Sequence, residues 1–116
     1  MTDGGCLLTV TFYGSVKVVE DCNLMRPVKA ALESAVRYMA AELGPKHIRV
    51  HALSPGPLKT RAASGLDRFD ELLDRARARA PQNRLVSIED VGFLATFLVS
   101  DRVAALTGNI EYIEGL

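Results

Sequence analysis

The chain is poor in cysteine and has no excess charge of either sign. Its 116 residues include two cysteines, no tryptophan, 14 basic and 14 acidic residues. Cys6 and Cys22 form neither a disulfide framework nor a metal-ligand spacing, so we expect a reduced, cytoplasmic protein. The balanced charge gives no general attraction to nucleic acid or to an anionic membrane surface, and we expect neither partner.

Long apolar runs are also missing. No segment approaches the roughly 18 apolar residues that a membrane-spanning helix needs. The first residues, MTDGG, contain no basic segment followed by an apolar one, which argues against a secretory signal. His47 and His51 have no partner histidine or carboxylate at metal-binding spacing, so we expect structural roles for them and no metal site.

What the chain does contain is an alternation of strand-like and helix-like segments. Short apolar segments rich in β-favouring residues lie at 6–13, 47–54 and 108–116. Segments with helical spacing lie at 28–44, 67–80 and 88–100. Strands that alternate with helices pair in parallel, so the order predicts an α/β fold.

Two helix boundaries have recognisable signals. Pro27 is tolerated as a first helical residue, which predicts that the first helix begins there and leaves Cys22 in a loop. Ser87 and Asp90 have the spacing of a capping box, in which the serine hydroxyl accepts the backbone N–H of Asp90. The first helix should face the core with its apolar residues at helical spacing: Val28, Ala31, Leu32, Ala35, Met39 and Leu43.

Ligands of parallel sheets bind beyond the carboxyl ends of the strands. The segments at those ends are 13–22, 54–63 and the residues from 115 onward. The first two carry the neighbourhood of Lys29 and the loop SPGPLKTRAASG, and we expect the site there.

Several stretches resemble one family. They are GGCLLTVTFYG, the Met25–Lys29 spacing, AALESAVRYMAAELGPKHIRVHALSPGPLKTRAASG and SIEDVGFLATFLVSD. Together they are similar to the C-terminal half of bacterial NADH-dependent enoyl-acyl-carrier-protein reductases, members of the short-chain dehydrogenase/reductase superfamily. The resemblance implies that residues 1–116 form a single partial Rossmann-like domain, the C-terminal half of a doubly wound parallel sheet with about three strands.

The resemblance also implies a function and its site. Such enzymes act in fatty-acid biosynthesis as homotetramers and pass hydride from NADH to a trans-2-enoyl thioester of acyl carrier protein. Lys29 falls on the family lysine that holds the nicotinamide ribose. The family loop that flanks the nicotinamide and the pyrophosphate falls on Leu58, Lys59, Thr60, Arg61 and Ala62. We therefore expect NADH as cofactor, an acyl-carrier-protein thioester as substrate and a homo-oligomer.

Two positions depart from the family pattern. The catalytic tyrosine of the family falls on Cys22, and its second active-site tyrosine falls on Phe12. A thiol is a weak hydrogen-bond donor and a phenyl ring has none, so we expect both positions to be non-functional in catalysis. No glycine-rich phosphate-binding turn follows a strand in these residues, so we expect the chain alone to be inactive and not to bind NADH.

Two functions stay open. One is enoyl reductase activity, retained by descent or assembled with another chain that supplies the nucleotide-binding half. The other is a non-catalytic remnant or an interaction module that pairs through its helices. Cys22 is either an incidental cysteine or a thiol activated by the nearby Lys29. Arginines 75, 77 and 79 spread around their helix and favour a solvated face over a nucleic-acid surface.

Overall fold

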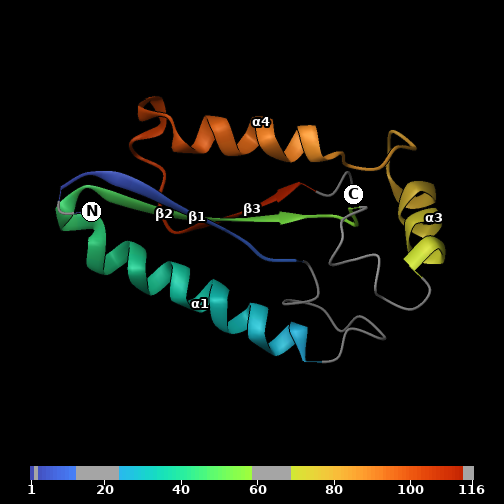
Figure 1. The fold of residues 1–116 in the computed structure, drawn as a ribbon, viewed down its shortest axis with the longest axis horizontal. Coiled ribbons are helices and arrows are strands. Elements are labelled where there is room, and N and C mark those ends of the chain that lie inside the picture. Colours follow the sequence, from blue (N-terminus) through green and yellow to red (C-terminus); the bar gives the residue numbers. More distant parts are fainter. Residues whose placement is uncertain (2, 13–23, 59–68, 114–116) are drawn as a thin grey trace.

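A computed structural model describes residues 1, 3–12, 24–58 and 69–113, and within these ranges the strands form one parallel sheet between two helices (Figure 1). The strands are β1 (Gly5–Val10), β2 (Ile48–Pro55) and β3 (Asn109–Ile113), in the order β1-β2-β3. Helix α1 (Met25–Leu43) covers one face and α4 (Ile88–Val99) covers the other, while α3 (Phe69–Arg79) lies beyond the carboxyl ends of the strands (Figure 1). The parallel α/β fold predicted from the sequence is confirmed.

Strand β2 is the centre of the molecule. It pairs with β1 on one side and with β3 on the other, with Leu7 opposite Val50 and His51 opposite Asn109. Residues 48–54 are all buried. A strand covered on both faces and paired on both edges is shielded from water, so its polar residues Arg49, His51 and Ser54 are buried together with its apolar ones.

The core between the sheet and α1 corrects one prediction. Its members are Val36, Ala40, Val50 and Ala52, with Leu7, Leu43 and Ile110 packed against them. The predicted face was wrong in part, because Val28 and Met39 are 58% and 39% exposed. Helix α1 has apolar residues on two faces, and the face toward the sheet is the one that carries the buried Glu33.

The start of α1 was also predicted wrongly. The helix begins at Met25, and Pro27 is its third residue. The first backbone N–H groups of any helix have no partner within the helix, so a proline in the first turn removes no hydrogen bond. At the other end of the helix, Gly44–Lys46 form the short 3-10 turn η2, and His47 follows with a left-handed φ of 56°.

The part of the chain that the structure describes holds no helix that is long and apolar enough to cross a membrane. The same residues contain no group of three or more His, Cys, Asp or Glu side chains that could hold a metal ion.

Candidate functional site

Lys29 lies where the sequence placed the site. It is in the second turn of α1, and this helix begins at the end of the molecule where the strands have their carboxyl ends (Figure 1). Its ammonium Nζ donates a hydrogen bond of 2.9 Å to the carbonyl of Val10, the last residue of β1. This bond fixes the head of a long, flexible side chain at the edge where parallel sheets bind their ligands.

A second polar contact lies next to the first. The hydroxyl of Thr11 donates a hydrogen bond of 2.7 Å to Oε1 of Glu33, and the two residues are 2% and 4% exposed. The backbone N–H of Thr11 donates to the carbonyl of Leu53 at 2.7 Å, which ties the end of β1 to β2. Glu33 was not predicted from the sequence, although its position four residues after Lys29 places both side chains on one face of the helix.

The remaining predicted site residues divide into two groups. Phe12 and Leu58 are half-buried and follow the carboxyl ends of β1 and β2, the two neighbouring strands. The others lie outside the described residues: Cys22, Lys59, Thr60, Arg61 and Ala62. The structure therefore brings Lys29 and Phe12 to the end of β1, and Leu58 to the end of the neighbouring strand β2.

The donors of Lys29 fit the sugar of a dinucleotide. An ammonium has three N–H donors, and the contact with Val10 uses one of them. Ribose offers two neighbouring hydroxyl oxygens as acceptors. A lysine held by one backbone carbonyl, with further donors directed elsewhere, is therefore chemically suited to bind a ribose diol.

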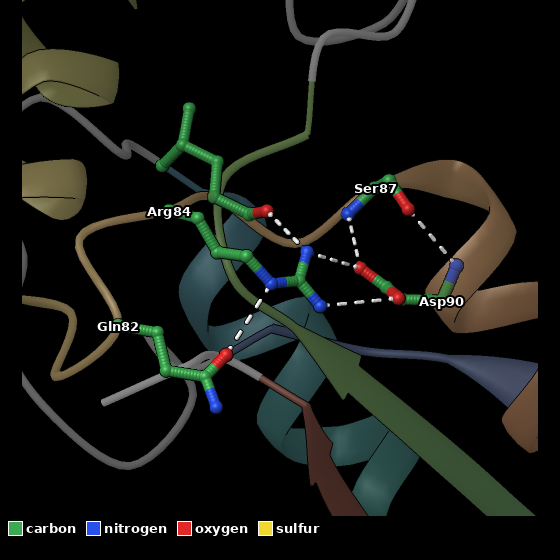
Figure 2. Close-up of polar contacts among 5 residues, drawn as sticks. Gln82, Arg84, Ser87 and Asp90 are labelled. Atoms are coloured by element: carbon green, nitrogen blue, oxygen red, sulfur yellow. Dashed lines mark hydrogen bonds and ion pairs between the residues drawn. The ribbon is translucent and has the colours of Figure 1, made fainter.

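A second polar cluster lies at the start of α4 (Figure 2). Arg84 forms a two-pronged ion pair with Asp90, with nitrogen–oxygen distances of 2.9 and 3.3 Å, and its Nε donates to Gln82 at 3.4 Å. The predicted capping box is confirmed, since Asp90 N–H donates to the Ser87 hydroxyl at 3.1 Å and Ser87 N–H donates to the Asp90 carboxylate at 2.9 Å.

The charge of Asp90 is stabilised by these contacts. The hydrogen bond from Arg84, followed by those from Ser87, holds the pKa of the Asp90 carboxyl far below its ordinary value of 3.8. The same ion pair raises the pKa of the Arg84 guanidinium. An open cavity of about 240 Å³ lies against this cluster and reaches from Gln82 to Phe93 and Ile113. The sequence pattern predicted the helix cap formed by Ser87 and Asp90, but it gave no indication that Arg84 pairs with Asp90.

Buried basic residues lie on the face of the sheet toward α4. Arg49 donates hydrogen bonds to the carbonyls of Leu98 at 2.6 Å and Ser100 at 3.0 Å, at the C-terminal end of α4. His51 is fully buried, and its Nε2 lies 3.3 Å from the Arg49 guanidinium. Among the residues that the structure describes, its Nδ1 has no hydrogen-bond partner. Burial, and then the positive charge of Arg49, lower the pKa of His51.

The comparison with known proteins decides the family. The family model for enoyl-(acyl carrier protein) reductase matches residues 1–115. The chain belongs to this family. It is 47% identical over 114 residues to the NADH-dependent enoyl-[acyl-carrier-protein] reductase 1 of Rhizobium meliloti, covering 98% of this chain and 42% of the relative. The corresponding reductase of Escherichia coli is 42% identical over 115 residues, covering 99% of this chain and 44% of that protein.

Solved structures agree with the family assignment. The enoyl-acyl carrier protein reductase of Bacillus cereus, solved with NADP⁺, superposes with a TM-score of 0.95 at 41% identity, over 99% of this chain and 45% of that one. The reductase of Anaplasma phagocytophilum, solved with NAD, gives a TM-score of 0.89 at 37% identity. The predicted Rossmann-like class is confirmed, and the chain spans less than half the length of the relatives it matches.

Proposed function

We propose that this chain carries part of the active site of an NADH-dependent enoyl-acyl-carrier-protein reductase of fatty-acid biosynthesis, with Lys29 as the residue that holds the nicotinamide ribose. The observation that supports this role is the hydrogen bond from Lys29 to Val10 at the carboxyl end of β1. Residues 58–62 would flank the cofactor, because they follow the end of the neighbouring strand β2 in the sequence.

Bound NADH would supply the hydride for reduction of a trans-2-enoyl thioester of acyl carrier protein. The residues of this chain would bind and orient: the Lys29 ammonium toward the ribose hydroxyls, and the half-buried Phe12 and Leu58 as apolar walls beside it. Since two cysteines do not make a disulfide framework, we propose that the chain works in the reducing cytoplasm.

The chain by itself is proposed to be inactive. Charge develops on the thioester oxygen when hydride adds to the enoyl group, and a placed hydrogen-bond donor at that oxygen lowers the barrier by about 3 kcal/mol. Phe12 has no donor, and the thiol of Cys22 is a weak donor on a shorter side chain than tyrosine. Neither residue can replace a tyrosine hydroxyl at the developing charge.

A direct assay tests the inactivity. The 116-residue chain is mixed with NADH and a crotonyl thioester, and the rate of NADH oxidation is measured. In a separate titration, calorimetry measures NADH binding. We expect no NADH oxidation above the buffer rate, no measurable NADH binding, and no turnover after Cys22→Tyr alone, because Phe12 still provides no donor. NADH oxidation by the unchanged chain would show that the assignment of Phe12 and Cys22 as non-functional is wrong. Oxidation by Cys22→Tyr would show that Phe12 does not prevent turnover.

A chimera tests the role of Lys29. The 116 residues replace the matching portion of the Escherichia coli reductase, with Phe12→Tyr and Cys22→Tyr introduced to supply both hydroxyls. We expect turnover in the chimera and a loss of about 100-fold or more after Lys29→Met, because the ribose is no longer held in place. Lys46→Met, on the exposed turn after α1, is the matched control and should have no effect. Equal activity of both variants would contradict the proposal.

We also propose that the chain is a homo-oligomer. Strand β1 pairs on one side with β2 and forms an outer strand of the sheet among the described residues. Unpaired N–H and C=O groups along an outer strand are a template for another chain. Exposed apolar residues on α1 and α4 add a second surface: Met25, Val28, Phe93 and Phe97.

Light scattering at micromolar concentration measures this association. We expect a mass of at least twice the 12.6 kDa of one chain. A folded monomer with cooperative unfolding would contradict the proposed homo-oligomer. Both candidate functions predict an oligomer that does not bind NADH, so the chimera separates them. A folded chimera without turnover would favour the second candidate function, a non-catalytic interaction module.

A further inference from the structure

Two side chains from adjacent turns of α1 reach two adjacent residues at the end of β1. Lys29 and Glu33 are four residues apart and share one face of the helix. The Lys29 ammonium donates to the carbonyl of Val10 at 2.9 Å, and the Glu33 carboxyl accepts from the hydroxyl of Thr11 at 2.7 Å. The end of β1 is therefore bonded to α1 twice in succession.

The second of these bonds is more protected than the first. Thr11 and Glu33 are almost fully buried, whereas the contact between Lys29 and Val10 is exposed to solvent. Water competes for the exposed bond but does not reach the buried one, since a buried polar group keeps its protein partner. A third bond, from Thr11 N–H to the carbonyl of Leu53, fixes Thr11 to the central strand.

We propose that Glu33 is a positioning residue for Lys29. By holding Thr11, Glu33 sets the distance between α1 and the end of β1, and this distance places the Val10 carbonyl where the Lys29 ammonium meets it. The inference deepens the proposed function, because it assigns a residue that places the ribose-binding group. It concerns the place of the ammonium and does not require NADH or turnover.

Chemical labelling of lysine tests the inference. The folded chain is treated with a trace amount of an amine-acylating reagent, and mass spectrometry measures labelling of Lys29 relative to Lys46 in the same molecule. We expect Glu33→Ala and Thr11→Val each to raise this ratio about threefold to tenfold, because the hydrogen bond that shields the Lys29 ammonium is weakened. The double variant should give no further increase, because both single changes remove the same contact.

A conservative variant separates positioning from a general loss of stability. Glu33→Gln keeps an oxygen that accepts the Thr11 hydroxyl, so the ratio should stay close to that of the unchanged chain. Glu42→Ala, at an exposed position of the same helix, is the matched control. Circular dichroism establishes that each variant is folded; if Glu33→Ala does not fold, the nearly isosteric Thr11→Val carries the test.

Two results would overturn the inference. One is an unchanged labelling ratio in folded Glu33→Ala or Thr11→Val. The other is a ratio in Glu33→Gln as high as in Glu33→Ala. Because the chimera assay reads turnover and the labelling reads the ammonium without cofactor, failure of one is distinguishable from failure of the other.

Discussion

The two faces of the sheet bury polar side chains in different ways. Toward α1, the Thr11 hydroxyl meets the Glu33 carboxyl in a short hydrogen bond beyond the carboxyl end of β1. Toward α4, Arg49 donates to backbone carbonyls, and the Nδ1 of His51 beside it has no partner among the described residues. The face toward α1 thus buries a hydrogen-bond donor with its acceptor, and the face toward α4 buries two basic side chains.

The position of each group along the strands explains the difference. Thr11 and Glu33 lie next to Lys29, at the end where a parallel sheet binds its ligand. Arg49 is the second residue of β2, near the opposite end, where it satisfies the carbonyls that the C-terminus of α4 leaves without helical partners. One face thus buries a polar pair next to the candidate site, and the other buries a cation that bonds the end of α4 to the sheet.

The largest expected effect comes from removing that cation. Arg49→Met leaves the carbonyls of Leu98 and Ser100 buried without their charged donor. We expect a loss of about 3 kcal/mol in the free energy of unfolding, measured by urea denaturation. Arg79→Met, at an exposed position of α3, is the control and should change it by less than about 0.5 kcal/mol. An equal effect of both variants would contradict the role of Arg49.

A smaller effect should appear as a dependence of stability on pH. Because the pKa of His51 is lowered from 6.5 in the folded chain, the unfolded chain takes up the proton first as the pH falls. The contribution of neutral, buried His51 to the stability of the fold is therefore fully present above about pH 6.5 and decreases as the pH falls below it. His51→Asn should remove this part of the pH dependence, measured as melting temperature between pH 7 and 5. The same slope in both proteins would show that His51 is not its source.

The smallest effect is expected at the start of α4, where Arg84 and Asp90 are more exposed. The lowered pKa of Asp90 means that its contribution to stability is present above about pH 3.8 and is lost as the pH falls further. Arg84→Gln should move the pKa of Asp90 back toward its ordinary value, measured by carbon NMR of the carboxyl group. Arg77→Gln is the control, and an unmoved Asp90 in Arg84→Gln would contradict the ion pair.

Much of the fold was predictable, because its signals are local. Alternating apolar segments indicated the parallel strands, and the Ser87–Asp90 spacing indicated the start of α4. The start of α1 was not predicted, because proline is accepted at several positions of a first turn. The buried face of α1 was also assigned in part wrongly, since the helix has apolar residues on both sides and Glu33 occupies the core side.

The candidate site was predictable to a similar extent. Topology predicted that Lys29 lies near the carboxyl ends of the strands, and its bond to Val10 is found there. Its role in holding the cofactor stays a prediction. The partners of the buried polar groups were not predicted. Glu33 and Thr11 are 22 residues apart in the sequence, and Arg49 and Leu98 are 49 apart. No local pattern specifies such distant pairs.

The sequence by itself determined the alternation of strands and helices, the helix cap at Ser87 and the family, because each depends on neighbouring residues or on the order of residues along the chain. The tertiary structure alone decided which face of α1 is buried, which carbonyl holds Lys29 and which groups satisfy Glu33 and Arg49. A buried polar group must find a partner wherever the packed chain brings one, and only the folded arrangement of the sheet between its two helices fixes that place.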